Sequence, residues 1–259
     1  MWIVSRRQTK LKFGQSHSQL ESLVQERTVA LQVLSRRLLR VQDEERRRVA
    51  RDLHDSTGQL LTALKISVAL LQRRLDKDEE TREELSAIAG LADQALQEIR
   101  TTSFLLHPPL LDEVGFHSAA RWYVEGFAER SGLKVRMDFA PAAERLPDVI
   151  ETALFRVLQE SLTNVHRHSG TSEVDVHFRQ EAQVVTLEVR DYGRGIPKAL
   201  LNRLGDPARH SGVGLAGMRE RLSELNGGFE IEPADPGTRV LAVVPLAAQA
   251  AAAAAPSCA

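Results

Sequence analysis

The sequence predicts a multidomain chain, with an N-terminal helical hairpin followed by a separate α+β domain. Three observations predict it. Apolar residues recur three and four positions apart from about residue 20 to residue 106, as on one face of a long helix. His107-Pro108-Pro109 then ends the pattern, because proline restricts its predecessor and cannot continue the hydrogen-bond ladder. Beyond this break, helical and strand-like segments alternate, which indicates a mixed domain.

The first part of the chain shows a heptad pattern, with Val24, Leu31 and Leu38 at one apolar position and Leu20, Leu34 and Val41 at the other. We interpret residues 1–35 as a signalling coiled coil or linker. An apolar stripe continues from Leu53 to Leu75. A polar connection follows, and Thr81 with Glu84 resembles a capping box that opens a second helix.

Residues 36–110 thus form the predicted hairpin. One hairpin cannot bury its stripe alone, but two hairpins form a four-helix bundle, which predicts a homodimer. Residues 111–248 form the predicted α+β domain, joined by a flexible connection at Leu106–Glu113, and residues 249–259 a low-complexity tail. The expected helices of this domain are 116–131 and 147–167. The expected strands are 134–139, 173–179, 184–190, 229–232 and 239–245.

Composition excludes several classes of protein. With 34 Lys and Arg against 35 Asp and Glu, no strong global charge favours direct nucleic-acid binding. The single cysteine, Cys258, rules out a disulfide framework and fits a reducing, cytoplasmic location. No apolar run reaches the roughly 18 to 20 residues that span a bilayer. Met1-Trp2-Ile3-Val4, followed by Arg6-Arg7, is either the remnant of a membrane segment of an inner-membrane sensor or an arbitrary start.

The most informative stretch runs from Glu45 to Gln59 and contains His54 beside Asp55. Asp55 is able to accept a hydrogen bond from one imidazole nitrogen, which leaves the other free to attack. Ala50 and Gly58 would leave the imidazole uncrowded, and Gly58 costs a helix roughly 1 kcal/mol against alanine. Gln59 could hold a water molecule. The alternative is a solvated helix face with an incidental histidine.

A second cluster lies on the predicted helix 147–167, where Glu160, Asn164, Arg167 and His168 share one face. Asparagine and glutamate oxygens suit Mg²⁺, and an arginine suits phosphate. His166 and His168 lack the further ligands of a zinc site. Taken alone, this stretch is equally compatible with an amphipathic surface helix.

Two glycine-containing segments complete the set. Asp191-Tyr192-Gly193-Arg194-Gly195 follows a predicted strand, where an acid can read an exocyclic amine and glycines let a flat ligand approach. The run Gly212-Val213-Gly214 leads into a helix whose N-terminal N–H groups form an anion site. It lacks the Gly-Lys-Ser/Thr ending of a P-loop. The polar segment 202–211 before it is interpreted as a lid.

Taken together and in this order, the four segments resemble a bacterial two-component sensor histidine kinase. The ATP-binding half is similar to the GHKL superfamily of gyrase-type and chaperone ATPases, which implies an α/β sandwich. The first half resembles the subfamily whose partner response regulators are of the NarL type. The resemblance covers roughly residues 36–246.

The resemblance implies a role for each candidate residue. His54 would be the phosphoacceptor, Asp55 its base, and Gln59 a residue for phosphatase activity. Further implied roles are Mg²⁺ binding by Asn164 with Glu160 beside the metal, phosphate contact by Arg167, adenine recognition by Asp191 with Gly193 and Gly195, closure of the lid by Gly212 and Gly214, and support of the adenine-binding acid by Thr238.

The implied function is autophosphorylation of His54 from Mg-ATP, followed by transfer to an aspartate on the receiver domain of a response regulator. Arg46, Arg47, Arg48 and Arg51 would attract that acidic partner and the phosphates. Three alternatives stay open: an ATP-gated dimeric scaffold without autokinase activity, a gyrase- or chaperone-type ATPase, and a protein whose net activity is that of a phosphatase. No sensory domain is visible, so the stimulus cannot be inferred.

Overall fold

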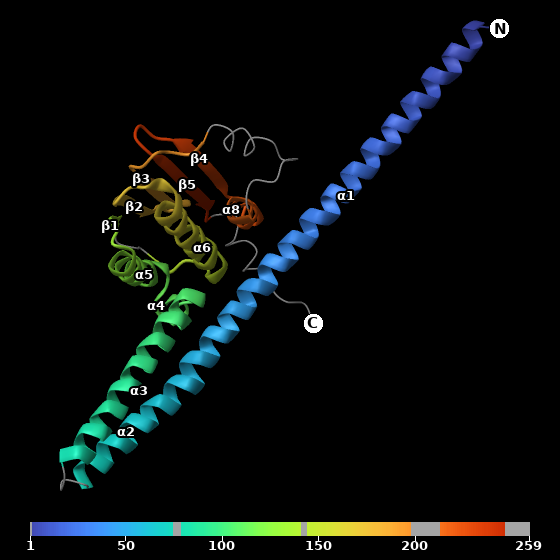
Figure 1. Ribbon diagram of the computed structural model, residues 1–259. Helices are drawn as coiled ribbons and strands as arrows, with labels where there is room; N and C mark the ends of the chain where they lie inside the picture. Colours follow the sequence, from blue (N-terminus) through green and yellow to red (C-terminus); the bar gives the residue numbers. More distant parts are fainter. Residues whose placement is uncertain (1, 75–78, 141–143, 198–212, 247–259) are drawn as a thin grey trace. The chain divides into compact units, whose positions relative to one another are not determined.

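The computed structural model describes residues 2–74, 79–140, 144–197 and 213–246 (Figure 1). The first element is a helix of 51 residues, α1 (Trp2–Asp52). The chain divides into two compact units, with the boundary between Glu44 and Glu45. Among the described residues, none of the helices combines the length and the apolarity needed to cross a bilayer.

The first unit contains most of α1, and its apolar seam is uncovered. All six heptad residues of the sequence analysis expose more than half of their surface, from 54% for Leu34 and Val41 to 65% for Leu31. An exposed seam at this spacing is what a coiled-coil partner would cover. The coiled coil therefore stays a prediction, and the exposed apolar seam is the observation that favours it.

The second unit opens with the predicted hairpin. A five-residue π turn (Leu53–Thr57) follows α1, and α2 (Gly58–Arg74) continues the helical path; α3 (Glu79–Leu106) returns beside it. Helix α3 already begins at Glu79, so the capping box predicted at Thr81 is wrong. Glu79 and Glu80 instead place two carboxylates in the first turn, where the helix dipole favours negative charge.

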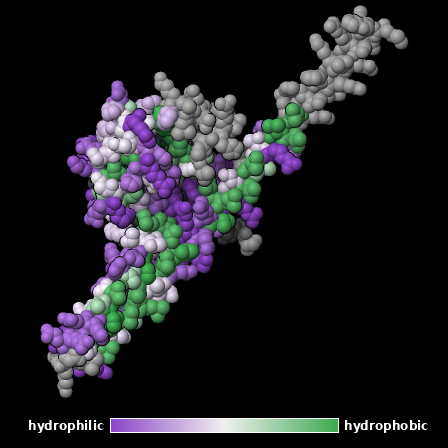
Figure 2. Space-filling view, in the orientation of Figure 1, coloured by the Kyte–Doolittle hydropathy of each residue, from purple (hydrophilic) through white to green (hydrophobic). Residues whose placement is uncertain are grey.

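The hairpin leaves much of its apolar stripe uncovered. Only Val68 of α2 and Ala92 and Ser103 of α3 are buried. Leu60 and Leu91 expose 69% and 66% of their surface. Figure 2 shows the resulting green apolar surface along the hairpin. Contiguous exposed apolar surface of this kind marks an interaction face.

The α+β domain contains a five-stranded sheet and the helices that pack on it. Its elements are α4 (Pro109–Val114), α5 (Phe116–Ser131), β1 (Lys134–Phe139), α6 (Asp148–Asn164), a second π turn (Val165–Ser169), β2 (Glu173–Gln180), β3 (Val184–Asp191), α8 (Val213–Glu224), β4 (Gly228–Pro233) and β5 (Thr238–Pro245). All five predicted strands are present, each within two residues of its predicted ends.

The sheet has the order β1-β2-β3-β5-β4. Strands β1 and β2 are parallel, and the other neighbouring pairs are antiparallel. A parallel pair needs a crossover connection, and α6 lies in the connection between β1 and β2. Glu160 and Asn164 belong to this crossover helix.

The core lies between the sheet and helices α5, α6 and α8 (Figure 1). Alternate residues of β3 point inward, so that Val185, Leu187 and Val189 are buried. Leu154, Leu158 and Leu162 of α6 meet them at helical spacing, and each is fully buried. Burying one such leucine contributes about 1.5–3 kcal/mol. This core holds the edges of α6 and β3 in place, and the functional cavity lies beside it.

Candidate functional site

One cavity of about 830 Å³ brings together residues from α6, the second π turn, β3, α8 and β5. Its lining includes most of the predicted nucleotide-site residues: Glu160, Asn164, Arg167, His168, Asp191, Gly195, Gly214 and Thr238. Apolar side chains of Val165, Val189, Ile196, Leu215, Ile231 and Val240 complete the wall. A mostly apolar cavity with a few convergent polar groups is typical of a small-molecule site. Gly212 lies outside the described residues.

Asp191 occupies the deep part of this arrangement, at the end of β3. It follows the inward alternation of the strand and exposes only 6% of its surface. Its Oδ1 accepts a hydrogen bond of 2.8 Å from the backbone N–H of Gly193. A carboxylate fixed in this way at the cavity wall is suited to accept a hydrogen bond from an exocyclic amine.

Two glycines allow the chain to close around Asp191. Gly237 has a φ of +101°, and a Cβ there would lie 1.9 Å from the carbonyl oxygen of Asp191. A Cβ on Gly193 would lie 2.3 Å from the carbonyl oxygen of Ser169. Gly193 is not among the cavity-lining residues, so the structure gives it a packing role and its predicted contact with nucleotide stays a prediction.

The cavity lining also includes Glu160 and Asn164, one turn apart on α6. The amide Nδ2 of Asn164 donates to Oε1 of Glu160 over 3.4 Å, which leaves the amide oxygen of Asn164 as an acceptor. Gly214 packs directly on Glu160, since a Cβ there would lie 1.8 Å from Oε1. Arg167 and His168 are exposed on the π turn that follows.

These oxygens fit Mg²⁺ better than a fully protein-coordinated metal. Among the described residues, no group of three or more His, Cys, Asp or Glu side chains could hold a metal ion. Magnesium needs only one or two protein oxygens when phosphates and water supply the others. Glu160 and Asn164 meet that requirement in the lining of a cavity large enough for a nucleotide.

His54 lies in a second, smaller groove of about 410 Å³, in the hairpin. The end of α1, the π turn and α2 form the first arm of the hairpin, and α3 forms the second. The groove is lined by His54, Asp55, Gly58, Gln59, Thr62, Ala63 and Ile66 of the first arm, and by Leu96, Ile99 and Arg100 of the second. His54, Asp55 and Gln59 are exposed. His54 sits inside the π turn, a feature frequent at functional sites. None of the described residues lines both the groove and the larger cavity.

The residues before His54 have partners of their own. Ala50 is fully buried, and the Ser103 hydroxyl of α3 donates to its carbonyl oxygen over 2.8 Å. Arg47 pairs with Asp112 at 2.8 Å, and Arg48 pairs with Glu45 at 2.6 Å. The uncrowded imidazole and the arginine contacts with phosphate stay predictions.

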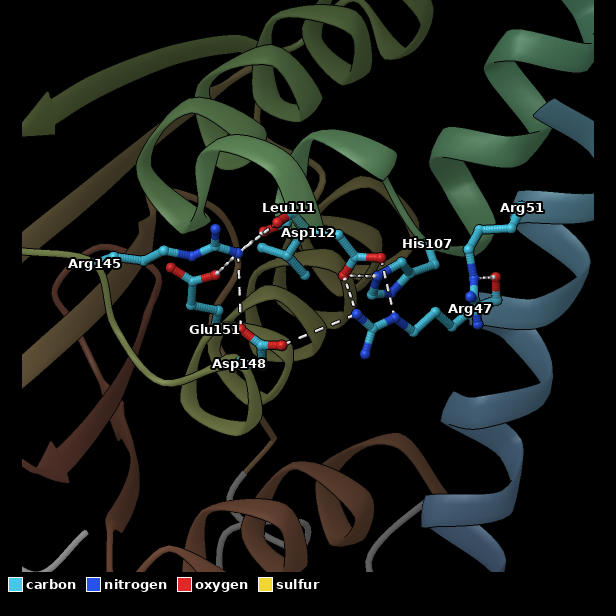
Figure 3. Close-up of polar contacts among 8 residues, drawn as sticks. All are labelled: Arg47, Arg51, His107, Leu111, Asp112, Arg145, Asp148 and Glu151. Atoms are coloured by element: carbon cyan, nitrogen blue, oxygen red, sulfur yellow. Dashed lines mark hydrogen bonds and ion pairs between the residues drawn. The ribbon is translucent and has the colours of Figure 1, made fainter. Parts of the chain in front are cut away.

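The segment after α3 is packed against its neighbours, and the predicted flexibility of the connection at Leu106–Glu113 stays a prediction. His107 and Leu111 each expose only 2% of their surface. Asp112 accepts hydrogen bonds of 3.0 Å from both His107 Nε2 and Arg47 Nε (Figure 3). From the other side, Arg145 donates to the carbonyl oxygen of Asp112 over 2.6 Å. We call His107, Asp112, Arg47 and Arg145 the joint.

Burial makes His107 a neutral partner in the joint. Desolvation lowers its pKa below the usual 6.5, although the hydrogen bond to Asp112 favours the protonated form. The nearby Arg156 and Arg47 lower it further. Sequence reasoning treated His107 only as the end of a helix, and no local motif distinguishes it.

Comparisons with known proteins agree with this division. Residues 45–111 match a family described as histidine kinase, and residues 149–248 match the family of histidine kinase-, DNA gyrase B- and HSP90-like ATPases. The chain therefore contains a histidine kinase segment and an ATPase domain of the kind shared by histidine kinases. The first match contains the His54 groove, and the second contains the residues lining the cavity.

Named relatives support the same family. The sensor histidine kinase MctS of Rhizobium johnstonii is 31% identical over 84% of this chain and 47% of its own length. The oxygen sensor histidine kinase NreB of Staphylococcus carnosus is 31% identical over 82% of this chain and 60% of its own. The kinase/phosphatase DegS of Brevibacillus brevis is 29% identical, over 83% and 55%. The chain thus spans about half the length of the curated relatives it matches.

Among solved structures, the histidine kinase domain of the blue-light activated histidine kinase EL346 from Erythrobacter litoralis superposes with a TM-score of 0.48. The two are 17% identical, and the match covers 74% of this chain and 96% of that domain.

Sequence reasoning missed several residues that shape the two sites. Gly237 and Ser169 hold the backbone around Asp191, and Ser103 fixes α3 against the first arm. Gly237 had a signal, because it stands between Pro236 and Thr238 in a turn before a strand. Ser103 had none, since its role depends on which residue of α1 it faces.

Proposed function

We propose that this chain is an ATP-dependent protein histidine kinase that phosphorylates His54 and passes the phosphoryl group to an aspartate of a response regulator. The observation that supports it best is the combination of a nucleotide-sized cavity in one domain with an accessible imidazole in a groove of the other. An ATPase of the gyrase or chaperone kind would have no use for the second site.

In the cavity, the adenine ring lies between the apolar walls, and Asp191 accepts a hydrogen bond from its exocyclic amine. Gly195 and Thr238 lie beside that position, while Gly193 shapes the backbone around it. Apolar walls exclude water from the ring, which strengthens the single directional contact that selects adenine.

In the same cavity, Asn164 and Glu160 would hold Mg²⁺, and Arg167 and His168 would contact the phosphates. Mg²⁺, when bound, neutralises charge on the phosphate oxygens. Gly214 lets the N-terminus of α8 approach Glu160, and the N–H groups there favour negative charge. Closure of a lid by Gly212 and residues 202–211 stays a prediction, since both lie outside the described residues.

In the chemical step, one imidazole nitrogen of His54 attacks the γ-phosphorus of ATP. A P–N bond forms, the bond from phosphorus to the bridging oxygen breaks, and ADP leaves with the electron pair. Asp55 accepts the proton from the other ring nitrogen. Because the cavity and the groove share no described lining residue, the two domains must approach each other for transfer.

The partners follow from the exposed faces. The uncovered stripe that includes Leu60, Leu64 and Leu91 indicates a homodimer through a four-helix bundle. The response regulator is proposed to be of the NarL type. Gln59 lies in the same groove as His54, where it could position water for the reverse, phosphatase reaction.

Labelling with γ-phosphate-labelled ATP tests the proposal. The wild-type chain should acquire acid-labile, base-stable label, and His54→Gln should lose it while still binding ATP. An ATP-gated scaffold would bind ATP without any covalent product. Undiminished label in His54→Gln would exclude His54 as the acceptor.

A further inference from the structure

Arg100 is a cation in the His54 groove to which the proposed mechanism gives no role. It lies on α3. Among the residues that line the groove, Arg100 is the one arginine and Asp55 the one carboxylate. Its side chain is exposed and makes no hydrogen bond or ion pair with any residue that the structure describes. A guanidinium left without a protein partner in a groove is available for an anion.

The register of the hairpin sets Arg100 opposite His54. Ser103 donates to the carbonyl oxygen of Ala50 over 2.8 Å, and both residues are fully buried. The two arms run antiparallel, so one turn after Ala50 on the first arm faces one turn before Ser103 on the second. Those positions are His54 and Arg100. Farther along, Lys65 of α2 pairs with Asp93 of α3 at 2.6 Å, a further contact between the two arms.

A phosphoryl group on His54 would enter this groove with about two negative charges. The neighbouring carboxylate of Asp55 would repel it, which would raise the energy of the phosphorylated state. A guanidinium on the facing helix offsets that repulsion, and its planar fork of N–H donors matches two phosphoryl oxygens.

We propose that Arg100 binds the phosphoryl group as it is transferred to His54 and holds it there afterwards. The physiological donor rests on the proposed function, but the contact depends only on a phosphoryl group at His54. A small donor therefore tests it without the ATP-binding domain.

Phosphoramidate is such a donor. The imidazole nitrogen attacks its phosphorus, a P–N bond to His54 forms, the P–N bond of the donor breaks, and ammonia leaves with the proton. The full chain, Arg100→Gln, Arg100→Lys and the control Arg74→Gln are each treated with phosphoramidate, and ³¹P NMR follows the phosphohistidine. Arg74 is an exposed arginine at the end of α2 and does not line the groove. Its replacement removes the same charge as Arg100→Gln but leaves the groove unchanged.

Arg100→Gln should slow phosphorylation of His54 about tenfold, the size expected for one charge-assisted hydrogen bond. It should also raise the second ionisation pKa of the phosphoryl group in the ³¹P titration, because a cation beside the dianion is lost. Arg100→Lys, which keeps the charge without the fork, should lie between wild type and Arg100→Gln. Arg74→Gln should match wild type.

An unchanged phosphoryl pKa in Arg100→Gln overturns the proposal whatever happens to the rate, because a purely structural role or a role in docking the regulator would leave that pKa alone. If Arg100→Gln does not fold, the ³¹P titration of Arg100→Lys decides by the same criterion. Failure of wild type to take label from ATP, with normal labelling by phosphoramidate, would reject the proposed function and leave the test of Arg100 intact.

Discussion

The two candidate sites share a local device and use it differently. Leu53–Thr57 and Val165–Ser169 are both five-residue π turns, and each is followed by a glycine. Gly58 has helical angles, so the helix continues, whereas Gly170 has a φ of 72° and ends it. The first turn buries no residue; the second buries Val165 and Ser169. The packing behind a π turn therefore decides whether it opens a groove or forms the wall of a cavity.

The largest difference between the sites should appear in their glycines. Gly193→Ala places a Cβ 2.3 Å from a backbone oxygen, and backbone cannot move aside as a side chain can. We expect a loss of about 3 kcal/mol in the free energy of unfolding, as for overpacking in a rigid region. Urea denaturation measures it, and ATP binding should weaken in parallel. Wild-type stability would show that the wall of the cavity yields.

An intermediate effect is expected at the joint, between the two sites. His107→Gln keeps a hydrogen-bond donor for Asp112. It should still lower the free energy of unfolding by about 1 kcal/mol at a pH near 8, where His107 is neutral in both the folded and the unfolded chain. Unfolding free energies from urea titrations at about pH 5 to 8 provide the measurement.

The pH dependence gives this variant a second signature. Because the pKa of folded His107 is lowered, the unfolded chain binds more protons below the usual pKa of 6.5. Wild-type stability therefore falls as the pH drops through that range, and this contribution is absent from His107→Gln. Equal slopes in the two proteins would contradict a buried neutral imidazole.

The smallest effect on stability is expected at Gly58. The nearest atom to an added Cβ is the Leu53 carbonyl oxygen at 3.8 Å, which is ordinary contact. Gly58→Ala should leave stability unchanged or raise it by up to about 1 kcal/mol, the propensity gain of alanine in a helix. A clear loss of stability would show that the π turn itself requires glycine.

Gly58→Leu extends the same comparison to function. It should spare folding yet impair phosphorylation from ATP, because a bulky side chain in the His54 groove obstructs a docking domain. Circular dichroism checks the fold, and labelled ATP checks the transfer. Normal transfer in Gly58→Leu would remove the proposed reason for this glycine.

The fold was predictable where local pattern decides it. Strand β3 could be located from its alternation, and the end of α3 from Pro108 and Pro109. The order of the strands was not, because it depends on which inward faces meet. The π turns were missed as well, since one inserted residue changes the hydrogen bonding without a distinct apolar pattern.

The candidate sites divide in the same way. Asp191, Asn164 and His54 stand in recognisable motifs, whereas Asp112 pairs with Arg47, which is distant in sequence. Arg47 illustrates the limit: its position beside His54 in the sequence suggested a phosphate contact, but the fold turns it to Asp112. A charged residue in a sequence predicts that it will bind an opposite charge, but only the packing of the fold determines which one.

The pairing of β3 with β5 has a consequence for how nucleotide and folding are linked. These strands come together from distant parts of the chain, from Val184 with Pro245 to Arg190 with Arg239. Asp191 and Thr238 face the same cavity only once that non-local pairing has formed. A partly folded chain would therefore have no nucleotide affinity, and each tenfold excess of ATP over its dissociation constant should add about 1.4 kcal/mol to the native state. On the proposed function, nucleotide would therefore serve this domain as a folding ligand as well as a substrate.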